Sequence, residues 1–191
     1  MAGRRAGAAL ALAAIALSAA GCGIGGSTKT VTQTVTRTVT TTRTVTQPSG
    51  SVTGCTGSEL SGTFAYAPGS QGAGHIAYTL TLTNTSQTSC TIDGLPAAVL
   101  LDASGSPLPT HVTGTEGGPL VNLVPGASAK STARFSPDVP GSGDSQSGAC
   151  QPKAYTLQVT PNGGGTVDAP VKPPTSVCER GSLDFDVYAG G

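Results

Sequence analysis

Apolar and polar side chains alternate with a period of two along residues 62–187, and nowhere in this region with the period of an α-helix. This alternation is typical of half-buried β-strands, because successive side chains of a strand point to opposite faces of a sheet. Short runs of Gly, Pro, Asn and Asp, which favour turns, separate the alternating stretches. The pattern predicts about eight strands: Phe64 and Tyr66; Ile76, Tyr78, Leu80 and Leu82; 97–101; 120–124; Ala129, Ser131, Ala133 and Phe135; Tyr155, Leu157 and Val159; 167–171; and Leu183, Phe185 and Val187.

Residues 54–191 are therefore expected to form one all-β domain. Many short strands with frequent turn signals favour an immunoglobulin-like antiparallel β-sandwich with Greek-key connections. The Gly- and Ser-rich stretch 137–148 is expected to be a surface loop. The chain contains 28 Gly, 14 Pro and no Trp, which predicts a loop-rich domain with a thin core. Only 10% of its residues are charged and its net charge is zero, so a nucleic-acid-binding role is not expected.

Four cysteines lie within this domain, and their positions suggest how they pair. Cys55 and Cys90 are equidistant from the loop near residue 72, and Cys150 and Cys178 are equidistant from the turn near residue 164. Each pair therefore lies at the open end of a predicted hairpin. We expect the disulfides Cys55–Cys90 and Cys150–Cys178, although four cysteines allow three pairings. Zinc binding is the alternative, but no closely spaced Cys-x-x-Cys is present.

The N-terminal 21 residues have the organisation of an export signal. Arg4 and Arg5 precede the apolar run 8–20, which is too short to span a bilayer and fits a secretory signal. Small residues then precede Cys22, as in a bacterial lipobox, which predicts a lipoprotein signal peptide at 1–21 and acylation of Cys22. The fifth, unpaired cysteine is thereby explained. The alternative is an ordinary signal-peptidase cut after Ala20.

Residues 22–53 are expected to be a disordered, low-complexity tether. Of the 20 residues from 28 to 47, 11 are Thr, and neither face of a strand made from them would bury much apolar surface. Lys29, Arg37 and Arg43 give this segment a positive charge, which either attracts it to an anionic surface or only keeps it soluble.

One set of short motifs runs through nearly all of residues 55–188: Cys55, Gly74-His75, Leu82-Thr83-Asn84, Cys90, Gly94-Leu95-Pro96, Leu101, Gly105, Leu123-x-Pro125-Gly126-x-x-Ala129, Cys150 and Cys178. In these motifs the chain resembles a bacterial lipoprotein family that is catalogued as domain of unknown function 4232 and occurs chiefly in actinobacteria. The resemblance implies a signal peptide with a lipobox, a low-complexity linker and one β domain, and it implies no established activity. Leu95 and Phe135 stand where an aromatic residue and Trp are common in the family.

Residues suited to catalysis are few. The chain lacks a Gly-x-Ser-x-Gly elbow, a Ser-x-x-Lys pair, a phosphate-binding glycine loop and a His-Glu-x-x-His motif. His75 follows a glycine at the start of a strand and is expected to bond to the adjoining loop, and His111 lies in a Pro/Thr-rich connection without an identifiable partner. Asn84-Thr-Ser is a formal glycosylation sequon, but a turn after the strand is expected there.

Carboxylates offer a weak metal hypothesis. Asp184 and Asp186 alternate with core residues and are expected to point outward from one strand. With Asp93, Asp102 or Asp168 nearby they would bind Ca²⁺ weakly, but a solvated acidic face is the expected arrangement.

Three classes of function follow from the sequence. The first is a membrane-anchored cell-envelope lipoprotein on the extracytoplasmic face, whose non-catalytic β-sandwich recognises an envelope protein or glycan through loops such as 113–119. The second is a structural or stress-related envelope component without a specific ligand. An enzyme is the least favoured class, because no nucleophile, base and orienting group can be named together. No metal, cofactor or nucleic acid is expected, and the membrane is expected as a partner through the N-terminal lipid.

Overall fold

The computed structural model describes residues 53–191. The predicted signal peptide 1–21, the acylation site Cys22 and all of the predicted tether except its last residue lie outside these residues. Within 53–191, neither helix has the length and hydropathy needed to cross a membrane.

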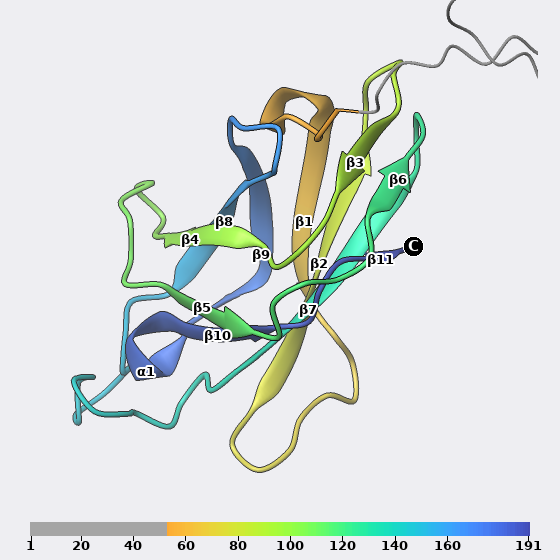
Figure 1. The fold of residues 1–191 in the computed structure, drawn as a ribbon. Helices are drawn as coiled ribbons and strands as arrows, with labels where there is room; N and C mark the ends of the chain where they lie inside the picture. Colours follow the sequence, from red (N-terminus) through yellow and green to blue (C-terminus); the bar gives the residue numbers. More distant parts are fainter. Residues whose placement is uncertain (1–52) are drawn as a thin grey trace, which may run out of the picture. The chain divides into compact units, whose positions relative to one another are not determined.

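The described chain is nearly all β, as predicted, with two very short helical turns (Figure 1). Its elements in chain order are η1 (Gly57–Glu59), β1 (Leu60–Tyr66), β2 (Ile76–Asn84), β3 (Cys90–Ile92), β4 (Ala97–Leu101), β5 (His111–Gly114), β6 (Val121–Leu123), β7 (Ser128–Phe135), β8 (Ala154–Thr160), β9 (Val167–Thr175), α1 (Cys178–Gly181), β10 (Ser182–Phe185) and β11 (Ala189–Gly190).

The strands form a large, nearly closed sheet and a small second sheet. The large sheet has the order β4-β8-β9-β1-β2-β7-β10-β5, with β11 also paired to β7, and the small sheet consists of β3 and β6. The two ends of the large sheet approach each other through the connection between β4 and β5. The N–H of Leu108 donates to the carbonyl of Leu100 at 2.8 Å, and the N–H of Leu100 donates to Thr110 Oγ1, also at 2.8 Å. The result is the sandwich-like architecture that the sequence predicts.

Two pairs of strands are parallel, which the expected antiparallel sandwich does not contain. β1 pairs in parallel with β9, and β5 pairs in parallel with β10. Parallel neighbours require a long connection between them, and here 100 residues separate β1 from β9 and 67 separate β5 from β10. The alternation of side chains is the same in both kinds of pairing, so the pattern could not distinguish them.

The core lies against the inward faces of the large sheet and is built around a group of aromatic rings. Phe64 on β1 packs against Tyr78 on β2 and Phe185 on β10, with ring centroids 5.2 and 6.1 Å apart. Tyr78 also contacts Phe135, 5.3 Å away. On β7 the predicted inward set is confirmed, because Ala129, Ser131, Ala133 and Phe135 are buried. A few large rings thus fill the centre of a core that is completed mainly by aliphatic side chains such as Leu80, Leu82, Leu157 and Leu183.

Both predicted disulfides are confirmed. Cys55 bonds to Cys90 with Cα atoms 4.8 Å apart, and Cys150 bonds to Cys178 with Cα atoms 5.5 Å apart. The hairpin argument holds as well, because Phe64 pairs with Leu80 on a register centred at residue 72. The first disulfide fixes the segment that enters the domain to β3, and the second fixes the loop before β8 to α1.

Candidate functional site

A pocket opens where the parallel strands β5 and β10 end and separate. Their pairing ends at Gly114 and Phe185. Beyond this point the chain that follows β10 remains on β7, because Asp186 N–H donates to the carbonyl of Thr132 at 2.9 Å. The loop that follows β5 turns away. A pocket of about 340 Å³ lies here, lined by Thr115, Glu116, Gly117, Gly118, Phe185, Asp186 and Val187.

Two glycines set the shape of this loop. A Cβ at Gly114 would lie 2.2 Å from the carbonyl oxygen of Phe185, and a Cβ at Gly118 would lie 2.8 Å from Cβ of Val187. Gly114 and Gly118 have φ angles of 150° and 147°, which side chains disfavour. The loop therefore touches the opposite segment at both ends, and the pocket lies between these contacts.

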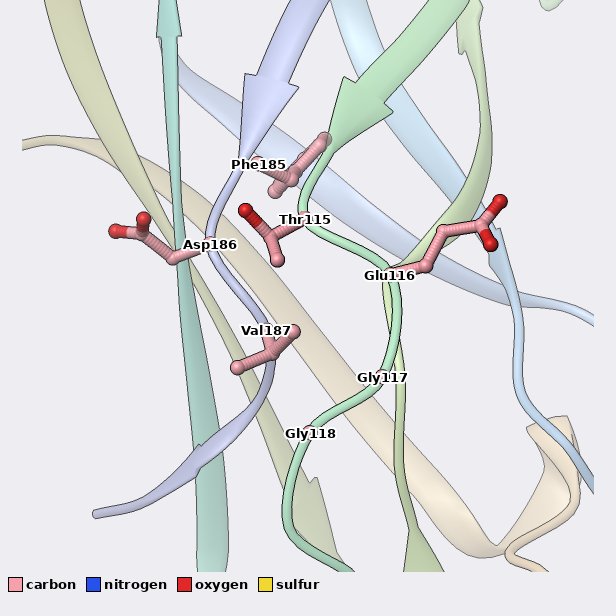
Figure 2. Close-up of a pocket in the computed structure, with 7 residues that line it drawn as sticks. All are labelled: Thr115, Glu116, Gly117, Gly118, Phe185, Asp186 and Val187. Atoms are coloured by element: carbon pink, nitrogen blue, oxygen red, sulfur yellow. The ribbon is translucent and has the colours of Figure 1, made fainter.

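The pocket has an apolar wall and polar flanks. Figure 2 shows Thr115 and Val187 between the two segments, and the carboxylates of Glu116 and Asp186 directed to opposite sides of them. Phe185 is buried and forms part of the wall. The site can accommodate a small apolar group with a hydrogen bond to the Thr115 hydroxyl. Its flanking negative charges favour a neutral or cationic group over an anion.

The segment that borders the pocket is anchored just beyond it. Tyr188 follows Val187, is buried, and donates its backbone N–H to the carbonyl of Gly94 at 3.2 Å. Its hydroxyl makes no hydrogen bond within residues 53–191, and burial raises the pKa of this phenol. Tyr188 thus attaches the pocket's edge to the core through packing and one backbone bond.

The two histidines occupy separate positions outside the pocket. His75 Nδ1 lies 3.0 Å from the carbonyl oxygen of Ala73 in the turn before β2, which is the local role expected for it. His111 is exposed and begins β5, opposite Ser182 of β10. Its placement in an irregular connection was therefore wrong, because a parallel partner far along the chain makes this short segment a strand.

The five aspartates of the calcium hypothesis are not gathered into one site. In the described chain none of them belongs to a cluster of three close metal-ligating atoms. Asp184 and Asp186 are exposed, as expected, and Asp184 lies opposite Arg134 in the register of β10 and β7. The other three accept hydrogen bonds from different parts of the fold: Asp93 from Asn162, Asp102 from Ser104 and Ser106, and Asp168 from Gln158. The Ser104 hydroxyl is the main cause of a lowered pKa at Asp102.

The carboxylate of Asp144 and the sulfurs of Cys150 and Cys178 do lie within 4.8 Å of one another. This cluster is structural, because the two sulfurs are bonded to each other. Asp144 in turn accepts backbone N–H groups of Gly141, Glu179 and Arg180. Its carboxylate is thus occupied by the protein itself.

Asp144 holds a turn of unusual backbone conformation. In α1, Glu179 and Arg180 have left-handed φ angles of 55° and 58°, and Gly181 follows with 76°. Left-handed residues with a Cβ are disfavoured, so a surrounding structure must hold them in place. The disulfide at Cys178 and the carboxylate of Asp144 provide it. No signal in the sequence marks Glu179 or Arg180 for this conformation.

The hydrogen bonds to Asp144 predict a pH-dependent contribution to stability. The N–H of Arg180 is the largest cause that lowers the pKa of this carboxyl, to about 2. Because the pKa is lower in the folded state, the stabilisation is complete above the unfolded value of ~3.9 and is lost as the pH falls through about 2. Asp144→Asn should therefore be less stable than the parent at pH 7, and the difference should shrink below about pH 4.

Chemical denaturation across this pH range measures the difference. Asp138→Asn, an exposed change in the same loop, is the control and should show no comparable pH dependence. A constant difference between Asp144→Asn and the parent from pH 7 to about 2 would contradict this assignment.

Asn84 has the turn-forming role that the sequence predicts. It is fully buried, and its Nδ2 donates to the carbonyls of Thr88 and Leu123 at 2.7 and 2.8 Å. Its Oδ1 accepts from the backbone and the hydroxyl of Ser86. The amide nitrogen that a glycan would modify thus donates two hydrogen bonds within the fold.

Residues 53–191 thus form a small, disulfide-bonded, sandwich-like β domain with a pocket where β5 and β10 separate. Residues 55–187 match the model of the family described as Domain of unknown function (DUF4232), and the chain belongs to that family. Neither a curated protein nor a solved structure matches the chain.

Proposed function

We propose that this chain is an envelope lipoprotein of actinobacterial type whose β domain recognises an envelope protein or glycan without catalysis. The observation that carries the recognition role is the pocket of about 340 Å³ between the loop 115–118 and the segment after β10. This volume lies at the lower end of the range of ligand pockets, which fits one side chain or one sugar unit better than a large cofactor. The loop 113–119, considered a binding loop from the sequence, supplies four of the lining residues.

The anchor in this proposal is the acylated Cys22. Its support is the sequence: a positive start, a short apolar run, and small residues directly before the cysteine. A lipid at Cys22 would hold the β domain at the outer side of the membrane.

Crosslinking in intact cells, followed by mass spectrometry of captured partners, tests both parts. Thr115→Arg fills the pocket with a long charged side chain at an exposed position, and capture should fall at least tenfold, or about 1.4 kcal/mol. The matched control is Thr63→Arg, an exposed threonine on β1, which should capture as the parent does. Cys22→Ala should move the protein from the membrane fraction to the soluble fraction.

Equal capture by Thr115→Arg and the parent would remove the pocket from the proposal. A parent protein without added lipid mass at its N-terminus would remove the anchor. If no partner is captured specifically by the parent, the second class, an envelope component without a specific ligand, is the better description.

A further inference from the structure

The outer edge of β6 is open. In the part of the chain that the structure describes, β6 pairs only with β3. Thr91 of β3 directs its backbone to the other side, because its N–H donates to Thr53 and its carbonyl accepts from Cys55. Asn122 lies opposite Thr91 in the antiparallel pair. In such a pair, two opposite residues either bond to each other through their backbone groups or both point these groups away from each other. The N–H and carbonyl of Asn122 therefore point away from β3, to the open edge.

This edge carries exposed apolar side chains. Leu120 is 64% exposed and Val124 is 50% exposed, and both lie on the same face as the exposed Asn122. Leu123, on the opposite face, is buried in the core. An open strand edge beside apolar side chains is a template for pairing with a further strand.

The sequence of the edge is nearly symmetric about Asn122. Residues 119–125 read Pro-Leu-Val-Asn-Leu-Val-Pro, so two antiparallel copies related by a two-fold axis at Asn122 match each other. Leu120 would lie opposite Val124 of the partner subunit, and Asn122 would exchange both backbone hydrogen bonds with Asn122 of the partner subunit. A self-complementary patch of this kind is what a two-fold dimer requires.

Charge favours this edge over the rest of the surface as the place where two copies meet. Residues 54–191 contain five Lys and Arg and ten Asp and Glu, a net charge of 5 − 10 = −5, so two domains repel each other overall. Residues 119–125 contain no charged side chain. Two copies can therefore approach at this edge without placing like charges together.

We propose that two copies of this chain associate through β6, forming a continuous sheet in the order β3-β6-β6-β3. Pro119 and Pro125 limit the new ladder to five residues, since proline cannot donate to it. Five paired residues bury less than the ~1,600 Å² of a standard interface, so the association is weak and depends on concentration. This proposal concerns a different surface from the pocket and does not depend on the proposed function.

Sedimentation equilibrium of the full chain tests the association, with Cys22→Ala in every protein to remove the cysteine outside the disulfides. Asn122→Pro removes the N–H that faces the partner and leaves the bonds between β3 and β6 intact. Leu120→Lys adds a charge to the edge at an exposed position. Each should weaken association at least tenfold, or about 1.4 kcal/mol. Val99→Lys, at an exposed apolar residue of β4, is the control and should associate as the parent does.

Crosslinking tests the register. Asn122→Cys should form a disulfide-linked dimer, and a mixture of Leu120→Cys and Val124→Cys should crosslink more than either protein alone. A circular dichroism spectrum shows whether each variant is folded, and if Asn122→Pro is not, Leu120→Lys decides. A parent that stays monomeric at ~1 mM, a weak interface being detectable there, would overturn the proposal. So would dimers unaffected by folded edge variants, or a monomer whose β6 instead binds an unrelated extended peptide.

Discussion

Replacing Cys55 and Cys90 together by Ala is expected to lower the free energy of unfolding by about 3–4 kcal/mol. The disulfide closes a loop with a sequence separation of 35, and its main effect is to restrict the unfolded chain. Both cysteines are buried, so alanine leaves small apolar side chains in their place. Urea denaturation of the parent and the double variant measures the loss.

The second disulfide provides an internal comparison. Cys150 and Cys178 have a separation of 28, and replacing both by Ala should cost nearly as much, about 3–4 kcal/mol. Ser147→Ala, an exposed change in the nearby loop, should have little effect and serves as the control. A loss below about 1 kcal/mol in either double variant would show that the unfolded chain is not restricted as this model requires.

The disulfide pattern was predictable from the sequence because it depends on hairpins, which are local. The β1–β2 and β8–β9 pairs are antiparallel and adjacent in the chain, and the midpoints of the cysteine pairs fall at the turns of these hairpins. A period of two is sufficient to find such strands, but not every end or face: β9 runs to Thr175, beyond the predicted 171. An irregularity in β8 leaves Tyr155 43% exposed, whereas the pattern placed it on one face with Leu157 and Val159. The spacing of the four cysteines about the two turns then indicates which cysteines pair.

Three strands were missed for the opposite reason. β3, β5 and β11 have three, four and two residues, which is too short for a period of two to be recognised. Each exists because a partner distant in the sequence lies beside it. β5, for example, is paired with β10, some 70 residues later.

The same reasoning explains why the pocket could be suggested only in part. The loop 113–119 was identifiable as a Gly-rich connection, but its opposite wall, the segment from Phe185 to Val187, was assigned to a continuous strand. β10 ends at Phe185, because beyond it the chain stays on β7 while the loop after β5 leaves. The place where two parallel strands separate is a tertiary feature, and no local pattern specifies it.

An apolar run also proved a poor guide to depth in the core. Residues 97–101 are all apolar, yet only Leu100 is fully buried and Val99 is 41% exposed. β4 lies at the end of the large sheet, where one neighbour is a strand and the other a loop. The core instead depends on a few large side chains on the central strands.

Phe64 is one of these side chains, and Phe64→Ala is expected to lower the free energy of unfolding by about 3–5 kcal/mol. The ring is fully buried between Tyr78 and Phe185, and its removal leaves a cavity that rings on two other strands cannot easily fill. Tyr155→Ala is the matched control, because this ring is 43% exposed on β8 and should cost much less. Thermal and urea denaturation of both variants measure the contrast. Equal losses would mean that the aromatic group does not hold β1, β2 and β10 together as its geometry indicates.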